Sequence, residues 1–275
     1  MNVLYVTTFN HRIWKASAKD MINSFFKSES EGDLLLCYEG FKYNAMKPAY
    51  MESRKIREKH IHRIKAYNMT RNPFLVKWLK ENSDVIPPEM GGRADRKKVP
   101  QAFLPWNFRA AGWFRKIVTL DYAMSHYGNQ YDAIVFLDAD AKVTKNLTPR
   151  LMDKAFGGKA FFYHWGSERP KKGLGVESGF IGFRTDRTGR RVLNCWIDKY
   201  KNKVFRRYMM WDDGGMFGNV VLEMKEREGI TGNDLVSNYS NKRRSQSHVI
   251  ERGMLAEYFR HDKGLHKRLG IVNEK

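Results

Sequence analysis

The chain has 275 residues and carries 50 lysines and arginines against 30 aspartates and glutamates, a formal net charge of +20 at pH 7. Its hydrophobic fraction of 42% and aromatic fraction of 13% exclude an intrinsically disordered chain. No apolar run approaches the roughly 20 residues that a membrane span needs, and no heptad or fixed-period repeat indicates a coiled coil or solenoid. The remaining class is a globular protein whose surface attracts anions.

Two features indicate the compartment. The chain has only two cysteines, Cys37 and Cys195, which cannot form a disulfide framework or a four-cysteine zinc site. Residues 2–8 are strand-like and are not a basic region followed by a long apolar stretch, so we expect no ordinary secretory signal. Both features predict a reducing, cytoplasmic setting.

Strand-like and helix-like patterns alternate along the chain, which predicts an α/β fold with a mostly parallel central sheet flanked by helices. The expected strands are 2–8, 33–38, 131–137, 159–165 and 175–184. The expected helices are 17–27, 74–80, 113–127, 149–156, 188–200 and 216–226.

The chain shows no convincing linker, so we expect a single domain over residues 1–275. Within it, residues 51–105 are predicted to be an insertion of helices and loops, because 54–65 is basic with helical spacing and Pro87, Pro88, Gly91 and Gly92 break the pattern that follows. Residues 229–275 are predicted to form a basic C-terminal extension that closes over the site.

The clearest candidate site is a pair of carboxylates, Asp138 and Asp140, directly after the apolar run Ala133–Leu137. In an open parallel sheet, ligands bind outside the carboxyl ends of the strands. If the backbone there stays extended, side chains two residues apart point to the same side, so both carboxylates can converge on one cation. Their oxygen atoms suit Mg²⁺ or Mn²⁺, ions that usually also bind phosphate oxygens. The alternative is a solvated turn after a strand.

Residues 131–143, with Asp138-Ala139-Asp140 at their centre, resemble the Asp-x-Asp segment of glycosyltransferases with the GT-A fold. The resemblance implies a GT-A fold, a nucleotide-sugar donor and a divalent metal. It places Thr7 and Thr8, at the end of the first strand, in the donor site. It also makes Arg115 and Lys116, on the helix before the Asp-x-Asp strand, candidates for donor contact; the alternative for both is a solvated helix face.

Two further segments agree with this family in order and spacing. Glu177-Ser178-Gly179 resembles the family's Asn-Ser/Thr-Gly strand, with Glu177 in place of the more usual Asn, and Gly179 would let the backbone approach the sugar closely. Asp212 and Asp213 resemble the acidic segment beside the reaction centre, where either would orient the acceptor, bind the sugar or act as a base. Helix N-capping is the alternative for these aspartates.

A third segment near the C-terminus, His261-Asp-Lys-Gly264-Leu-His266-Lys267, resembles the His-x-x-Gly-x-x-Lys element of glycogenin-like retaining enzymes. The resemblance implies that His261 completes the metal shell, that Gly264 passes near the diphosphate and that Lys267 neutralises the leaving group. It also favours retention of configuration. The family's Pro-Trp is replaced here by Arg268-Leu269, and His266 is a competing ligand.

The acceptor is predicted from the positive charge, because a donor diphosphate needs only a few cations. Basic residues are dense between Arg184 and Arg207, where only Asp186 and Asp198 oppose them, and recur at Lys171, Lys172, Lys242, Arg243 and Arg244. Two anionic targets fit, a nucleic-acid backbone and a membrane surface carrying a lipid-linked glycan. The basic residues of the first run are Arg184, Arg187, Arg190, Arg191, Lys199, Lys201, Lys203, Arg206 and Arg207.

Aromatic residues mixed into basic loops, at 106–109, 163–165 and 205–208, favour DNA over a membrane. The favoured hypothesis is therefore a phage-type glycosyltransferase acting on hydroxymethylated pyrimidines in the host cytoplasm. Three alternatives remain: synthesis of cell-surface or lipid-linked glycans, a two-metal nuclease or phosphotransferase built on the four aspartates, and a non-catalytic nucleic-acid-binding module.

Overall fold

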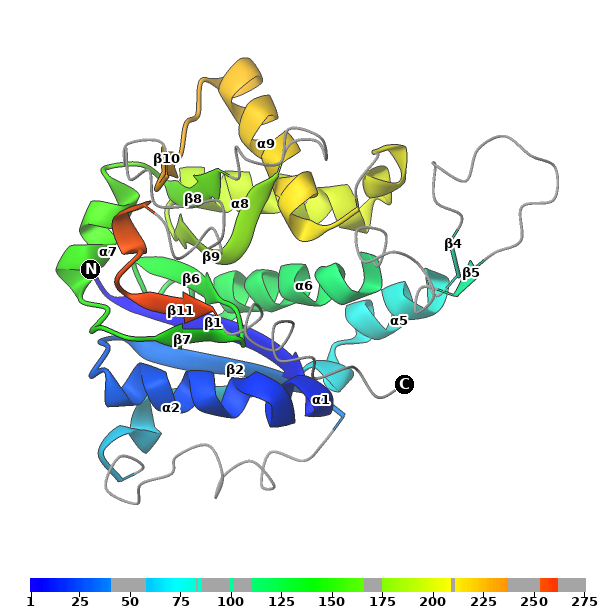
Figure 1. The fold of residues 1–275 in the computed structure, drawn as a ribbon. Coiled ribbons are helices and arrows are strands. Elements are labelled where there is room, and N and C mark those ends of the chain that lie inside the picture. Colours follow the sequence, from blue (N-terminus) through cyan, green and yellow to red (C-terminus); the bar gives the residue numbers. More distant parts are fainter. Residues whose placement is uncertain are drawn as a thin grey trace, which may run out of the picture.

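The computed structural model describes residues 1–40, 58–82, 84–85, 99–100, 110–165, 175–208, 211–236 and 253–261, with 84–85, 99–100 and 261 described for their backbone only. These residues form a mixed α/β structure around a central sheet of seven strands in the order β10-β8-β9-β6-β1-β2-β3 (Figure 1). The strands of this sheet are β1 (Val3–Asn10), β2 (Asp33–Glu39), β3 (Ile64–Asn68), β6 (Ala133–Leu137), β8 (Phe161–Trp165), β9 (Val176–Arg184) and β10 (Asn233–Asp234).

The sheet is mostly parallel, as the sequence predicts. β3, β2, β1 and β6 pair in parallel, and β8 pairs in parallel with β10, whereas β9 runs antiparallel to both β6 and β8. The carboxyl ends of β1, β6 and β8 therefore lie at one edge. In the register of β1 and β6, Val6 lies opposite Phe136, so Thr8 and Asp138 follow at the same level of that edge.

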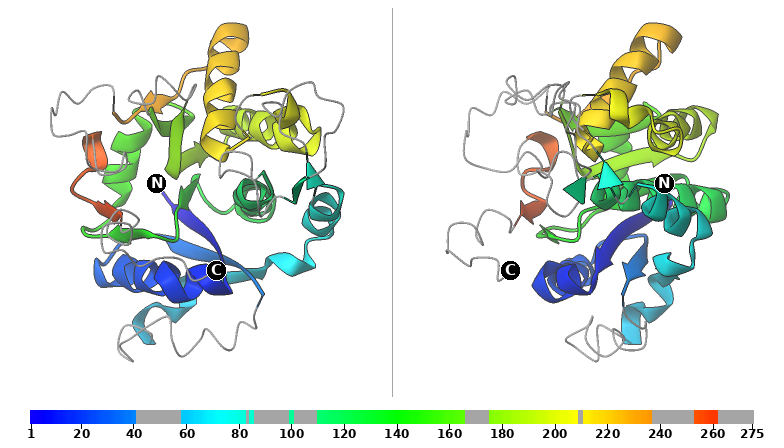
Figure 2. Two further views of the ribbon diagram at one scale, coloured as in Figure 1. Left: turned by 45° about the vertical axis from the view of Figure 1, so that its right-hand side comes forward. Right: turned by 90° about the vertical axis from the view of Figure 1, so that its right-hand side faces the viewer.

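Helices cover both faces of the sheet (Figure 2). Alternate residues of β1 point to opposite faces, so Leu4 and Val6 belong to one core cluster and Val3 and Tyr5 to the other. The first cluster is formed with α5 (Pro73–Glu81), α6 (Ala110–Tyr127), α8 (Arg187–Lys201) and α9 (Asp213–Glu228). The second is formed with α2 (Lys19–Lys27) and α7 (Pro149–Phe156).

The helices begin and end at residues suited to those positions. Asp186 and Thr148 accept hydrogen bonds from Gly189 N and Leu151 N at the starts of α8 and α7. α7 and α9 end at Gly157 and Gly229, both in the left-handed conformation that glycine adopts at no steric cost. Between β1 and α2 lie a short helix, α1 (His11–Ile13), and a π-helical turn, Trp14–Ala18.

Part of the predicted insertion belongs to the central sheet. We expected residues 51–105 to hold helices and loops, with helical structure over 54–65. Residues 58–63 are helical, ending in the 3-10 turn Ile61–Arg63, but Ile64–Asn68 form β3, the edge strand paired with β2. The basic residues there obscured the strand pattern, because an edge strand is only half-buried and tolerates charged side chains. The predicted helix over 74–80 is confirmed as α5. β4 (Asp84–Val85) pairs with β5 (Val99–Pro100).

The C-terminal region returns to the end of β6. β7 (Ala141–Val143) directly follows the Asp-x-Asp segment and pairs antiparallel with β11 (Phe259–His261), so the Cα of His261 lies opposite that of Ala141. Phe259 packs on Phe180 of β9 at a ring distance of 4.6 Å. The chain after β11 therefore continues from a position beside Asp140. In the part of the chain that is described, no helix is long and apolar enough to cross a bilayer.

Trp196 of α8 is fully buried against Phe183 and Phe217, and its indole N–H has no hydrogen-bond partner within the residues that the structure describes. We expect Trp196→Ala to lower the free energy of unfolding by about 3–5 kcal/mol through the cavity it leaves. Trp196→Phe should lower the free energy of unfolding clearly less than Trp196→Ala does, because it retains an aromatic ring and removes an unsatisfied hydrogen-bond donor. Urea unfolding followed by circular dichroism measures both, and equal losses for the two variants would contradict this account.

Candidate active site

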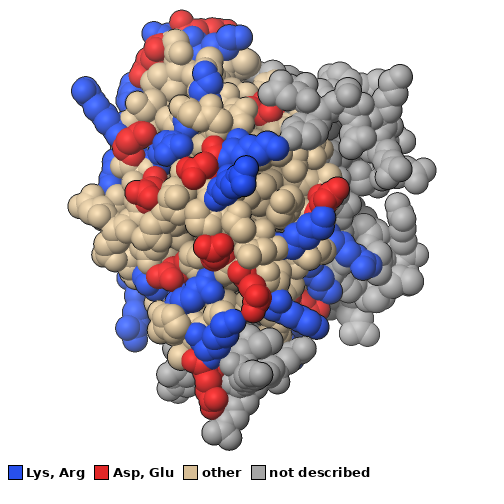
Figure 3. All heavy atoms as spheres, turned by 90° about the vertical axis from the view of Figure 1, so that its left-hand side faces the viewer, with Lys and Arg blue, Asp and Glu red and all other residues tan. Residues whose placement is uncertain are grey.

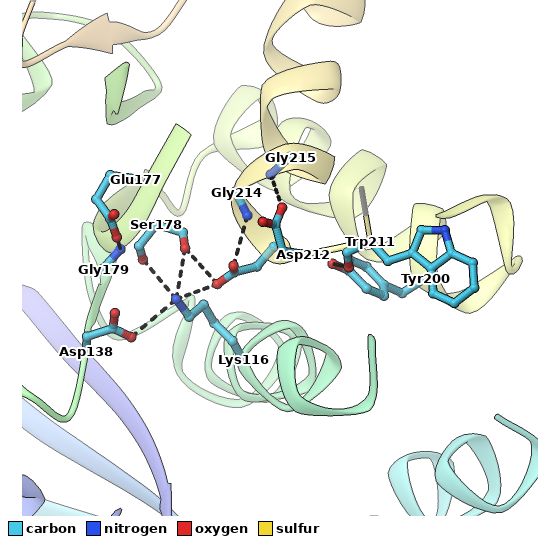
Figure 4. A network of polar contacts seen from close by, with 11 residues as sticks. Lys116, Asp138, Glu177, Ser178, Gly179, Tyr200, Trp211, Asp212, Gly214 and Gly215 are labelled. Atoms are coloured by element: carbon cyan, nitrogen blue, oxygen red, sulfur yellow. Dashed lines mark hydrogen bonds and ion pairs between the residues drawn. The ribbon is translucent and has the colours of Figure 1, made fainter. Parts of the chain in front are cut away.

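The ammonium group of Lys116 lies at the centre of the candidate site (Figure 4). It projects from α6 and is 2.6 Å from Asp213 Oδ2 and 3.3 Å from Asp138 Oδ1. It also donates to the hydroxyl and the carbonyl oxygen of Ser178, at 3.0 and 3.2 Å. Burial by itself would lower the pKa of Lys116, but Asp138 and Asp213 outweigh it and raise the pKa. The residue is therefore a fixed cation.

Asp213 is a fully engaged carboxylate at the start of α9. Its Oδ1 accepts from Gly214 N at 2.9 Å, and its Oδ2 accepts from the Ser178 hydroxyl at 2.6 Å as well as from Lys116. Burial would raise its pKa, but the Lys116 charge and these hydrogen bonds outweigh burial and lower the pKa. This geometry favours a fixed anion over a proton-accepting base.

Asp212 is the N-cap of α9. Its Oδ1 accepts from Gly215 N at 2.6 Å, and the side chain is almost entirely buried. The preceding residue, Trp211, is tied to α8 because its carbonyl accepts from the Tyr200 hydroxyl at 2.8 Å. The capping alternative for Asp212 is therefore observed, and the two neighbouring aspartates have different surroundings.

Gly179 leaves open a space where two carboxylates meet. A Cβ at this position would stand 2.9 Å from Asp138 Oδ2 and 3.1 Å from Glu177 Oε1. Glu177 Oε1 also accepts from Gly179 N at 3.0 Å, and Asp138 N donates to Gly179 O at 2.8 Å. Burial, followed by the nearby Asp138 charge, raises the pKa of Glu177. Asp138 and Glu177 thus converge where a side chain at 179 would otherwise lie.

The Asp-x-Asp segment is a turn rather than an extended strand. Ala141 N donates to Asp138 O at 3.0 Å, closing a turn over Ala139 and Asp140. The extended backbone that we expected to align Asp138 with Asp140 is therefore wrong. Asp140 is half-buried within the turn, and its role as a metal ligand stays a prediction.

Two described carboxylates could hold part of a divalent-metal site. Asp138 Oδ2 and Glu177 Oε1, which meet over Gly179, are hard oxygen ligands of the kind Mg²⁺ and Mn²⁺ prefer. Within the described ranges, no group of three His, Cys, Asp or Glu side chains is arranged to hold a metal ion. The side chain of His261 and the predicted donor contacts Gly264 and Lys267 lie outside the described residues. The backbone of His261 stands beside this turn, so the predicted third ligand starts from a suitable position.

The other residues predicted to contact the sugar donor lie near the same edge of the sheet, and their surroundings differ. Thr7 is buried and its hydroxyl has no hydrogen-bond partner among the described residues, whereas Thr8 is half-buried. Arg115 donates from Nε to both oxygens of Glu39 at 2.8 Å, and Nη1 donates to Ala111 O at 2.6 Å. Arg115 is therefore bound to the carboxyl end of β2 and does not lie on a freely solvated helix face.

Two polar residues at this edge were missed by the sequence reasoning. Ser178 joins Lys116 to Asp213, and the small hydroxyl residue before Gly179 in the quoted motif was its only signal. His164 of β8 is opposite Glu177 and fully buried; its Nδ1 is 3.2 Å from Phe180 O, and its Nε2 has no partner in the described part of the chain. Burial lowers the pKa of His164 to about 4, so the ring is neutral and Nδ1 must donate to that carbonyl.

Most of the basic run from Arg184 to Arg207 is bound to the protein itself. Lys199 pairs with Glu223 at 2.5 Å, Lys201 with Asp121 at 2.9 Å and Lys203 with Glu81 at 3.1 Å. Four arginines of the run are similarly engaged: Arg184 with Lys159 O, Arg190 with Thr185 O, Arg191 with Glu228 and Arg206 with Asn82. On the face in Figure 3, acidic and basic side chains are interspersed. Lys171, Lys172 and Lys242 to Arg244 lie outside the described residues.

No protein-family description matches the sequence, and neither does any curated protein. Similar solved structures include mouse xyloside xylosyltransferase 1, with TM-score 0.47, 12% identity, and coverage of 85% of each chain. The galactosyltransferase LgtC has a TM-score of 0.47 and 12% identity, and the match covers 79% of this chain and 69% of the LgtC chain. The glycosyltransferase GlyE of Streptococcus pneumoniae has a TM-score of 0.46 and 13% identity, and the match covers 84% of this chain and 44% of the GlyE chain. Likenesses at this level assign no activity or substrate.

The space at Gly179 yields a direct test. Gly179→Ala should leave the free energy of unfolding nearly unchanged, because the atoms a Cβ meets are the movable ends of two side chains. It should weaken Mn²⁺ binding by about 10-fold or more, because one of those atoms, Asp138 Oδ2, is a candidate metal ligand. Calorimetric titration with Mn²⁺ measures the change. Gly112→Ala in α6 is the matched control, since nothing lies within 4 Å of its Cβ, and it should bind Mn²⁺ as the unaltered chain does.

Proposed function

We propose that this chain is a metal-dependent glycosyltransferase that moves a sugar from a nucleotide-sugar donor to an acceptor hydroxyl. The observation that carries the proposal is the meeting of Asp138 and Glu177 over Gly179 at the carboxyl end of β6, with β11 paired beside the same turn. Open α/β sheets bind their ligands at this edge, and the carboxylate pair lies there. Three of the sequence segments that resemble GT-A enzymes, those of Asp138, Gly179 and Asp213, lie together at this edge.

The proposed roles draw both on the observed contacts and on the sequence resemblance. Asp138, with Asp140 and His261, would hold Mn²⁺ or Mg²⁺, which when bound supplies charge stabilisation for the departing nucleoside diphosphate. The unpartnered hydroxyl of Thr7 and the neighbouring Thr8 are assigned to the nucleotide, and Arg115, Gly264 and Lys267 to the donor. Of the predicted catalytic carboxylates, Glu177 is best suited to proton transfer, because its pKa is raised while that of Asp213 is lowered.

In the proposed reaction the bond from the anomeric carbon to the diphosphate oxygen breaks, and a bond from that carbon to the acceptor oxygen forms. The acceptor hydroxyl loses its proton to Glu177, and the electron pair of the broken bond leaves with the nucleoside diphosphate. Retention of configuration is proposed on the His261–Lys267 resemblance. The surroundings of Asp212 and Asp213 do not favour the two-metal nuclease, because Asp213 already pairs with Lys116 and Asp212 caps α9.

The first test is a donor screen that measures nucleoside diphosphate released in the presence of Mn²⁺. Release by the unaltered chain should require the metal and fall by at least about 10²-fold in Asp138→Asn, because the stabilisation at stake is several kcal/mol. Gly112→Ala serves again as the control. Full activity of Asp138→Asn with EDTA present would refute the metal-dependent mechanism, and plasmid cleavage without any sugar donor would support the nuclease.

The proposed acceptor is hydroxymethylated-pyrimidine DNA, on the grounds of net charge and the aromatic residues among the basic loops. The internal pairing of the run from Arg184 to Arg207 weakens that argument, because paired cations offer less charge to a phosphate backbone. The competing acceptor is a cell-surface or lipid-linked glycan at an anionic membrane surface.

The acceptor is tested by adding hydroxymethylated duplex, plain duplex and simple glycans separately to the donor-release assay. If DNA is the acceptor, only the hydroxymethylated duplex should stimulate release, and the stimulation should fall steeply with salt because phosphate contacts release counterions. Stimulation by glycans alone would remove the DNA proposal and leave the glycosyltransferase proposal intact.

A further inference from the structure

Asp138 presents its two oxygens to different neighbours. Oδ1 is 3.3 Å from the Lys116 ammonium, and Oδ2 faces the space at Gly179 where Glu177 also lies (Figure 4). A cation is thus already paired with one oxygen of the carboxylate that the proposed function assigns to the divalent metal. A metal at Oδ2 and the ammonium at Oδ1 would repel each other across a single carboxylate.

Lys116 has no proton left for a ligand. Its partners are Asp213, Asp138 and the two oxygens of Ser178, against the three N–H donors of an ammonium group. The side chain is only 6% exposed and its ammonium lies 4.5 Å from the centroid of the Phe136 ring. The donor-contact role predicted from the sequence therefore does not fit Lys116, which acts on Asp138 instead.

Asp213 determines how strongly that ammonium acts on Asp138. It is closer to Lys116 than Asp138 is, at 2.6 Å against 3.3 Å, and it is held in place by Ser178 and Gly214. Its negative charge offsets most of the positive charge that Asp138 would otherwise meet. The charged groups of Lys116 and Asp213 are buried, and electrostatic interactions between buried groups are stronger than in water.

We propose that Lys116 is a built-in competitor of the divalent cation for Asp138, and that Asp213, by neutralising Lys116, sets the strength of this competition. The inference rests on the proposed function, because the ion is the one assigned there to Asp138. It makes Lys116 and Asp213 positioning residues that tune metal affinity from behind Asp138 without touching the ion.

The proposal predicts opposite effects for the two partners. Lys116→Gln removes a positive charge near the ion and should tighten Mn²⁺ binding by about tenfold or more. Asp213→Asn leaves the Lys116 charge uncompensated beside Asp138 and should weaken binding by a comparable factor. A merely structural role would weaken binding in both variants, because either change disturbs the same buried network.

Calorimetric titration of the full chain with Mn²⁺ alone measures these affinities. Lys199→Gln is the matched control, since Lys199 is another buried lysine but pairs with Glu223, and it should leave the affinity unchanged. For a variant that is only marginally folded, the rise in Tm caused by Mn²⁺ is the second measurement. That rise should be larger than in the unaltered chain for Lys116→Gln and smaller for Asp213→Asn.

The outcomes separate this inference from the proposed function. Weaker or unchanged Mn²⁺ binding by Lys116→Gln overturns the competition, provided that Asp138→Asn still weakens binding. Unchanged binding by Asp138→Asn overturns the metal assignment of the proposed function itself. Tighter binding by Lys116→Gln together with weaker binding by Asp213→Asn supports both.

Discussion

The candidate site depends on the burial of one ammonium group. Lys116 projects from α6 and contacts the end of β6, the strand β9 and the first turn of α9, so a single cation fixes four elements relative to one another. A buried charge is tolerated only when it is paired and hydrogen-bonded. The positions of Asp138, Ser178 and Asp213 are therefore mutually constrained, and removing any one of them leaves the others with an unsatisfied charge or polar group.

Close approach of main chain to main chain brings these elements together. A Cβ at Gly214 would stand 2.1 Å from Val176 O, so the start of α9 reaches β9 only because that residue is glycine. Gly179 provides the corresponding space for the carboxylates of Asp138 and Glu177. The first glycine serves packing and the second lets two carboxylates approach each other, although the sequence shows only a glycine after Asp213 and a glycine after Ser178.

Elements with strong periodicity and clear end signals could be predicted, whereas those that depend on partners could not. β6 was predictable because its residues are apolar without interruption, and α8 because its apolar residues recur at helical spacing behind Asp186. β3 was not, because an edge strand is stabilised by pairing with β2 and its half-buried residues show no apolar run. The turn at Asp138–Ala141 was the alternative and not the favoured prediction, because the hydrogen bond that closes it cannot be recognised from residue types.

The sequence determines the net charge of +20, but it does not determine which of the charged side chains are available to a ligand. The sequence alone determined that the chain is basic, that its fold is α/β, and that carboxylates follow a buried strand at the edge where ligands bind. Only the tertiary structure decided which charges are available, because a lysine and its partner can lie far apart along the chain, as Lys203 and Glu81 do. It likewise decided that Lys116 faces inward to Asp138 and Asp213, since a charge can be buried only where opposite charges surround it.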